Sequence, residues 1–373
     1  MIYLDYAANT PADPAVLDSF LRAEQSHTGN PNAQHGAGRA AKERMRRAAE
    51  DIAELLCVQP AQLIYTSGAS EANNLALKGL ARAYRHGGRH IISTCLEHPS
   101  VSGALTALQE QGWEIDLLDI GGDGRVDVGH LKQLLRKDTV IVSVCLVDSE
   151  LGTVQPVDEI AAVLKSHPGC RFHVDATQAV GKIPVDFGIA DCMTFAPHKF
   201  YGLNGCGMLV KREGVVLEPL IHGGASTTPY RSGTPALALA VSMATALDVS
   251  LQSMEQRGAY VAALRKQLTE AFSSYPLARV NSTGEASPYI LNLSVKGVGG
   301  DRFQQELDKR GVCVSVKSSC SVAGVPSRPV YAVTRDRKNA LCSWRISLSH
   351  LTTQQEIEAF LEIFDLCYKE LAI

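Results

Sequence analysis

The sequence lacks a strong excess of charge of either sign, and it contains no long uninterrupted hydrophobic run. Lys and Arg total 36 against 39 Asp and Glu residues, so the formal net charge is −3. This mildly acidic balance argues against nucleic acid as a direct partner, because phosphate binding depends on clustered Lys and Arg. The longest apolar stretch, residues 235–251, is interrupted by Ser, Thr and Asp. It therefore predicts a buried helix and no membrane span.

The ten cysteines also lack a pattern, since none of them form a Cys-x-x-Cys pair or a regular spacing. This scatter indicates neither a metal site nor a disulfide framework. The first residues lack the basic and then apolar segments of a signal peptide. We therefore expect a cytoplasmic protein whose thiols are mostly reduced core residues.

Short apolar runs alternate with helical patterns between about residues 38 and 215. Candidate strands lie at residues 63–66, 90–95, 114–120, 139–147, 171–174, 192–195 and 206–210. Candidate helices lie at residues 70–84, 101–111, 128–136 and 157–165. This alternation predicts the α/β class, with a mostly parallel seven-stranded sheet covered by helices on both faces. Ligands of such sheets bind at the carboxyl ends of the strands.

A second pattern follows a helical region at residues 251–272. Candidate strands at 289–295, 312–316 and 344–349 flank a helix at 302–309, and a capping-box pattern at 353–356 opens the last helix. We expect a large domain of residues 13–250 and a smaller α+β domain of residues 251–373 that includes residues 1–12. Residues 318–339 are polar and aperiodic, which predicts a long functional loop.

Three segments of the predicted large domain contain candidate binding or catalytic residues. The first is Thr-Ser-Gly-Ala-Ser-Glu at residues 66–71, which follows a strand and opens a helix. The free N–H groups of such a turn attract an anion, and Ser70 adds a hydroxyl. The alternative interpretation is an ordinary serine N-cap.

The second segment is His-Val-Asp-Ala-Thr-Gln at residues 173–178, with Asp175 at the end of a buried strand. A buried carboxylate needs a cationic partner. A protonated pyridine nitrogen would be one, and the charge of Asp175 would keep that ring electron-accepting. The alternative is a structural aspartate paired with Lys or Arg.

The third segment is Ala-Pro-His-Lys at residues 196–199, again after a strand. Lys199 in that position can form a Schiff base with an aldehyde and later move a proton as a free amine. A phosphate-binding turn, a buried aspartate and a lysine in this order indicate pyridoxal 5'-phosphate (PLP) chemistry.

Further motifs extend this pattern over nearly the whole chain. They are Tyr-Leu-Asp-Tyr-Ala-Ala (3–8), Gly-Asn-Pro (29–31) with His35, Glu-His (97–98), Glu-Leu-Gly-Thr (150–153), His-Gly-Gly (222–224), Arg-Ser-Gly-Thr (231–234) and Trp-Arg-Ile-Ser-Leu (344–348). With these motifs the sequence resembles the cysteine desulfurases (NifS/IscS-like) of the class V aminotransferase family, which have fold type I of the PLP enzymes.

The resemblance implies a role for each matching residue. Lys199 would be the Schiff-base lysine, and Asp175 would pair with the ring nitrogen. Gln178 would bond the ring hydroxyl, while His98 would stack on the ring and assist proton transfer. The remaining cofactor contacts would come from Ala69, Ser70, His198, Ser149 and, across a homodimer interface, Thr234. The substrate-binding residues would be Arg345, for the carboxylate, and Asn30.

Cys320 lies in Ser-Ser-Cys-Ser-Val-Ala-Gly at residues 318–324, where cysteine desulfurases carry their nucleophile. Nearby Lys317 and Arg328 would favour a thiolate. The resemblance implies that L-cysteine is converted to L-alanine, with a persulfide on Cys320. An acceptor protein such as an iron–sulfur scaffold or a tRNA-thiolation protein would take the sulfur. The alternative is that Cys320 is an ordinary cysteine.

The sequence departs from the family pattern at four places. Ser149 stands where the family has Asn beside the ring, Ala196 replaces a phosphate-binding Ser, and Pro197 replaces Gly. Lys-Ser-Ser-Cys at 317–320 replaces Gly-Ser-Ala-Cys. One lost hydrogen bond is worth ~0.5–1.5 kcal/mol, so PLP affinity would fall several-fold without vanishing.

Two other function classes remain open. One is a different class V enzyme, namely a selenocysteine lyase, a C–S lyase or an aminotransferase, with Cys320 as a bystander. The other is a non-catalytic paralogue that acts as a binding partner. The presence of Lys199, Asp175 and Arg345 argues against this last class.

Overall fold

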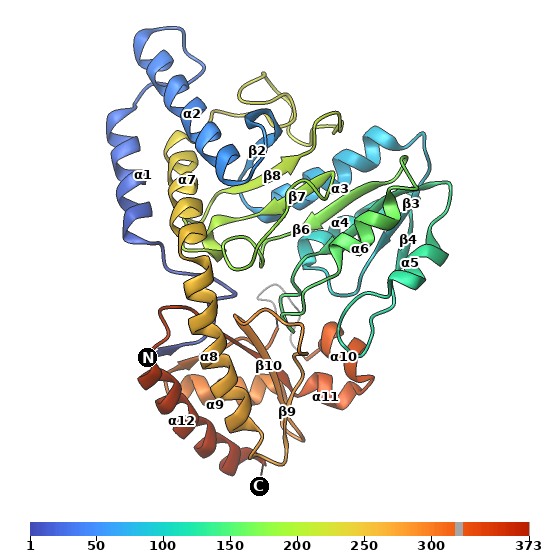
Figure 1. The fold of residues 1–373 in the computed structure, drawn as a ribbon, viewed down its shortest axis with the longest axis vertical. Coiled ribbons are helices and arrows are strands. Elements are labelled where there is room, and N and C mark those ends of the chain that lie inside the picture. Colours follow the sequence, from blue (N-terminus) through green and yellow to red (C-terminus); the bar gives the residue numbers. More distant parts are fainter. Residues whose placement is uncertain (318–323, 373) are drawn as a thin grey trace.

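The computed structural model describes residues 1–317 and 324–372. Its larger part is built on a seven-stranded sheet with the strand order β2-β8-β7-β6-β5-β3-β4 (Figure 1). The strands are β2 (Leu63–Thr66), β3 (His90–Ser93), β4 (Glu114–Leu117), β5 (Thr139–Cys145), β6 (Arg171–Asp175), β7 (Cys192–Phe195) and β8 (Gly207–Lys211). β8 pairs antiparallel with β2 and β7, whereas the other neighbours are parallel. The predicted mostly parallel α/β sheet is confirmed.

Helices cover both faces of this sheet, which is why its central strands are apolar throughout. On one face, α3 (Ala69–Tyr84) and α4 (Pro99–Gln109) pack on alternate strand residues such as Ile91. The opposite face, with Ile92, is covered by other helices. These helices are α2 (Gly36–Leu55), α5 (Val128–Leu134), α6 (Val157–Leu164) and α7 (Leu237–Gln252). Alternate side chains along each strand therefore pack into two separate hydrophobic cores.

The smaller part of the molecule has its own core around an antiparallel sheet. β10 (Ile290–Val295) lies between β9 (Ala278–Val280) and β12 (Ser343–Ser347). The helices that contribute side chains to this core are α8 (Met254–Phe272), α9 (Gly300–Lys309) and α12 (Gln354–Ala372). The N-terminal strand β1 (Ile2–Tyr3) pairs with β11 (Val312–Cys313), and Leu4 enters the same core.

Figure 1 shows α1 (Pro14–Ser26) lying beside α7, and α8 descending from α7 into the smaller part. In the described part of the chain, no single helix has the length and apolarity to cross a membrane. α7 and α8 reach that threshold only when combined, and they are bent by 64° at their junction.

The region predicted as a loop at residues 318–339 contains two short helices, so the prediction was wrong for its second half. They are α10 (Arg328–Thr334) and α11 (Arg337–Leu341). The Ser327 side chain caps α10 by accepting from the Val330 N–H, and Asp336 caps α11. Seven and five residues are too few for a helical period to show in a sequence.

Candidate active site

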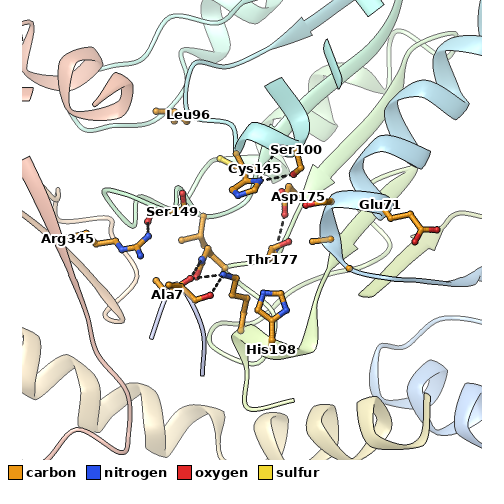
Figure 2. A pocket seen from close by; sticks show the side chains of 18 of the residues that line it. Ala7, Glu71, Leu96, Ser100, Cys145, Ser149, Asp175, Thr177, His198 and Arg345 are labelled. Atoms are coloured by element: carbon orange, nitrogen blue, oxygen red, sulfur yellow. Dashed lines mark hydrogen bonds between the residues drawn. The ribbon is translucent and has the colours of Figure 1, made fainter. Parts of the chain in front are cut away.

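A cavity of about 380 Å³ lies at the carboxyl ends of the strands of the large sheet (Figure 2). Its walls come from the segments that follow β2, β3, β5, β6 and β7, together with Arg345 on β12. This is where a parallel sheet is expected to bind a ligand. Nine of the predicted site residues line the cavity: Ala69, Ser70, His98, Ser149, Asp175, Gln178, His198, Lys199 and Arg345.

The turn between β2 and α3 forms one end of the cavity. Gly68 is the N-cap of α3, so the N–H groups of Ala69 and Ser70 have no partner within the helix. A side chain at Gly207 on β8 would lie 2.4 Å from the Gly68 carbonyl carbon, so the two backbones are in close contact. The turn therefore presents the start of a 16-residue helix to the cavity, which suits an anion.

Glu71 ties this turn to a distant loop. Its carboxylate accepts from the Ser67 N–H at 2.7 Å and from the Arg231 Nε at 2.9 Å. Burial alone raises the pKa of Glu71, but the bonds from Arg231 and Ser67 outweigh it and lower the pKa. Glu71 is thus held ionised beside the turn between β2 and α3.

Asp175 is 6% exposed and faces the cavity from the end of β6. Its oxygens accept from the Asn73 Nδ2 at 2.8 Å and from the Thr177 N–H at 2.9 Å. Throughout residues 1–317 and 324–372, no Lys or Arg lies within 4.0 Å of this carboxylate. The structural alternative, an aspartate paired with Lys or Arg, is therefore wrong. A cationic ring nitrogen in the cavity would supply the missing charge, so Asp175 fits PLP.

Lys199 ends a short 3-10 turn, Pro197–Lys199, that follows β7. Its Nζ donates to the carbonyl oxygens of Ala7 at 2.9 Å and Ala8 at 2.6 Å. Burial, followed by the charges of Lys199 and Lys182, lowers the pKa of His198 to about 4. His198 is therefore a neutral imidazole at pH 7, and its single ring N–H can donate one hydrogen bond to an anion.

His98 is the N-cap of α4. Its Nδ1 accepts the Ser100 N–H at 3.1 Å, so the proton of the neutral ring is on Nε2. Burial lowers the pKa of His98, against the charge of Asp175. The imidazole thus faces the cavity in one defined tautomer (Figure 2 labels its partner Ser100).

Arg345 is only 1% exposed, so it is no surface ion pair. One guanidinium nitrogen donates to the Ser149 carbonyl oxygen at 2.7 Å, and the other bonds Asp5 Oδ1 at 2.8 Å. The second Asp5 oxygen accepts from the Ser315 hydroxyl at 2.7 Å. The arginine is thereby fixed against the cavity by a carboxylate from the N-terminal segment.

Three predicted site residues are not in this cavity. Asn30 and Thr234 are exposed and do not line it. The role implied for Thr234 requires a second chain. Cys320 lies outside the described residues.

Sequence reasoning missed several residues that support the site. Asn73, three residues after Ser70, bonds Asp175, and Lys182, four residues after Gln178, bonds Gln178. The spacing of Ser70 and Asn73 was a usable signal, since residues three apart share a face of α3. Gln178 and Lys182 lie in a turn, where this rule does not apply. The pairing of Asp5 with Arg345 had no such signal.

Comparison with known proteins gives consistent results. The sequence profile of the Aminotransferase class-V family matches residues 2–360. The chain is 36% identical to cysteine desulfurase IscS of Glaesserella parasuis serovar 5, with 97% of this chain and 91% of that protein covered. It is also 36% identical to the IscS-like cysteine desulfurase of Mycobacterium tuberculosis, with 97% and 95% covered. The solved structure of a NifS-like protein superimposes with a TM-score of 0.92 at 31% identity, covering 98% of each chain. The chain therefore belongs to the class-V aminotransferase family and, within it, to the cysteine desulfurases of the NifS/IscS type.

Proposed function

We propose that this protein is a PLP-dependent cysteine desulfurase, which converts L-cysteine to L-alanine and takes up the sulfur as a persulfide on Cys320. The observation that carries the proposal is the buried Asp175. It faces the same cavity as Lys199, and no Lys or Arg of the described chain pairs with it. A cationic cofactor ring that Lys199 can hold covalently satisfies both groups.

The cavity offers a partner for each part of PLP. Lys199 would bind the aldehyde, Asp175 the ring nitrogen and Gln178 the ring hydroxyl. The phosphate would lie against the N–H of Ala69 and the side chains of Ser70 and His198, with His98 and Ser149 beside the ring. When bound, the pyridine ring accepts the electron pair that remains on the substrate α-carbon after its proton leaves.

The protein's own groups then have separate tasks. Arg345 binds the substrate carboxylate with a guanidinium that Asp5 already holds in place. The Lys199 amine removes the α-proton. His98, with its proton on Nε2, can donate that proton within the cavity.

Cys320 would provide the sulfur chemistry. Its thiolate attacks the sulfur of the substrate, so that an S–S bond forms as the substrate C–S bond breaks. The electron pair of the broken bond stays with the three-carbon product, which takes up a proton and leaves as alanine. The solved structure titled "SspA in complex with cysteine", 28% identical with a TM-score of 0.82, supports cysteine as the substrate class.

The outer sulfur of the persulfide would pass to an acceptor protein, such as an iron–sulfur scaffold or a tRNA-thiolation protein. We further propose a homodimer, in which the exposed Thr234 reaches the phosphate of the neighbouring subunit. The nine described cysteines are all free thiols, which supports a reducing compartment such as the cytoplasm.

Reductive trapping tests the cofactor assignment. The protein is incubated with PLP, reduced with borohydride, digested and analysed by mass spectrometry. We expect the pyridoxyl mass on the peptide that contains Lys199, and none after Lys199→Ala. Lys165→Ala, which removes an exposed lysine, should label like the wild type. Labelling at another lysine, or equal labelling of Lys199→Ala, would contradict the assignment.

A further inference from the structure

Lys182 is a buried lysine for which the proposed reaction has no task. It is 6% exposed and does not line the cavity. Its Nζ donates to the Gln178 Oε1 at 2.9 Å and lies 5.9 Å from the ring centroid of Tyr289. Among the described residues, no Asp or Glu lies within 4.0 Å of this ammonium group. Burying such a cation is costly, so its presence calls for a reason.

The surroundings of Lys182 disfavour its charged form. Burial, and then the positive charges of Lys199 and Arg345, lower its pKa from 10.5 to about 7. At and below neutral pH the ammonium form is populated, and this form can only donate hydrogen bonds. The atom of Gln178 in contact with it is the amide oxygen, since the amide nitrogen donates to the Ala7 carbonyl.

This contact and the Ala7 carbonyl together fix the orientation of the Gln178 amide, whose oxygen and nitrogen could otherwise exchange by a half-turn. With Oε1 on Lys182, the Nε2 group is on the other side and donates to the Ala7 carbonyl oxygen at 2.9 Å. An amide nitrogen carries two hydrogens, so a second N–H is left for the cavity that Gln178 lines.

The same carbonyl links Lys182 to the cofactor lysine. Ala7 O accepts both from Gln178 Nε2 and from Lys199 Nζ, each at 2.9 Å (Ala7 is labelled in Figure 2). A continuous chain of hydrogen bonds thus runs from the buried cation through Gln178 and Ala7 to Lys199.

We propose that Lys182 is a positioning residue for the cofactor, which holds Gln178 so that an amide N–H faces the ring hydroxyl of bound PLP. Without Lys182 the amide is held only by the Ala7 carbonyl, which also accepts from Lys199, so its second N–H is directed less firmly at the ring oxygen. The inference rests on the proposed function, because it requires PLP in the cavity.

A double-mutant cycle tests this role with PLP affinity as the readout. PLP is titrated into the apoprotein and followed by its absorption for the wild type, Lys182→Met, Gln178→Ala and the double variant. We expect Lys182→Met to weaken binding about 10-fold, the size of one hydrogen bond to a charged group. In the Gln178→Ala background the same change should have no further effect, because Lys182 acts through that amide.

Lys211→Met is the matched control. Lys211 is also 6% exposed, donates to the Val215 carbonyl oxygen at 2.8 Å and lies 5.0 Å from the ring of Tyr230, but neither of these partners lines the cavity. This variant should bind PLP within about two-fold of the wild type, because Lys211 is at the end of β8 opposite to Gly207, which contacts the turn at the cavity. Lys182→Gln, which is polar and uncharged, serves if Lys182→Met does not fold, and it should also weaken binding.

The outcomes separate the two proposals. If the wild type binds no PLP, the proposed function fails. If the wild type binds PLP, two results would overturn the positioning role. One is that the folded Lys182 variants bind PLP as tightly as the wild type. The other is that the Lys182 change weakens binding as much in the Gln178→Ala background as it does in the wild type.

Discussion

Single residues of the site depend on partners that are remote in the sequence. Arg345 and Asp5 are 340 positions apart, and Asp175 is 102 positions from Asn73. The sequence motifs identified Asp175, Lys199 and Arg345 as candidate catalytic or binding residues. They did not reveal Asp5, because only the fold brings it to Arg345, nor Lys182, because it follows Gln178 in a turn with no helical period.

Asp5→Asn should impair substrate binding more than turnover. The neutral amide keeps the shape of the aspartate but loses the charge that holds the Arg345 guanidinium. We expect the KM for L-cysteine to rise about 10-fold, with a smaller change in kcat, since a charge-assisted bond is worth ~1.5–3 kcal/mol. Steady-state alanine release measures both constants. An unchanged KM would show that Asp5 does not position the arginine.

Asp175→Asn should weaken the cofactor site itself. Replacing the carboxylate removes the charge that a ring cation needs, and the amide, which has a single acceptor oxygen, keeps only one of the two bonds donated by Asn73 and Thr177. We expect alanine release at saturating PLP to fall by at least about 10-fold, from the same range of charge-assisted energies. Asp116→Asn, at a half-exposed carboxylate beside His90, should retain activity. Equal loss in both variants would contradict the assignment.

At the scale of elements, the sequence pattern was most informative where strands are buried on both faces. The strands at residues 63–66 and 192–195 were predicted with their observed bounds, since turn residues border short apolar runs. The others differ by one to three residues at an end. The pattern failed for α10 and α11, whose start is determined by the caps Ser327 and Asp336 and not by a hydrophobic period.

The close contact of β8 with the turn between β2 and α3 predicts that a single added methyl group lowers stability and cofactor affinity. In Gly207→Ala the new Cβ would lie 2.4 Å from Gly68 C and 2.9 Å from the Ala69 nitrogen, so backbone must move. We expect a loss of ~1–3 kcal/mol in the free energy of unfolding and weaker PLP binding. Urea unfolding and PLP titration measure the two effects.

Gly103→Ala is the matched control for that experiment. Gly103 is exposed within α4, and its added Cβ meets no atom within 4 Å. This variant should gain ~0.5–1 kcal/mol from better helix propensity and leave PLP affinity unchanged. If Gly207→Ala also left both quantities unchanged, the turn would not depend on this contact.

For the whole molecule, buried carboxyls beside the cavity make stability depend on pH. Glu97 is 3% exposed, and burial raises its pKa from 4.5 to about 8. Between these two values the unfolded chain releases a proton that the folded protein keeps. The contribution of Glu97 is therefore fully present below pH 4.5 and is lost as the pH rises toward 8.

Glu97→Gln should remove this loss, because the amide oxygen can still accept from the Thr94 hydroxyl and the Cys145 N–H. The free energy of unfolding of the variant, relative to the wild type, should rise steadily from pH 5 to pH 8. Urea unfolding at three pH values measures it, with the exposed Glu362→Gln as control. A constant difference across this range would show that Glu97 is ionised in the folded protein.

The central claim is that Cys320 accepts sulfur from cysteine bound in the cavity. The most direct measurement is L-alanine release from L-cysteine, with added PLP and a thiol reductant, by the wild type and by Cys320→Ala. The account predicts alanine from the wild type and none from the variant, although both bind PLP through Lys199. Equal alanine release by the two proteins would contradict it, because the sulfur would then leave without the Cys320 thiol.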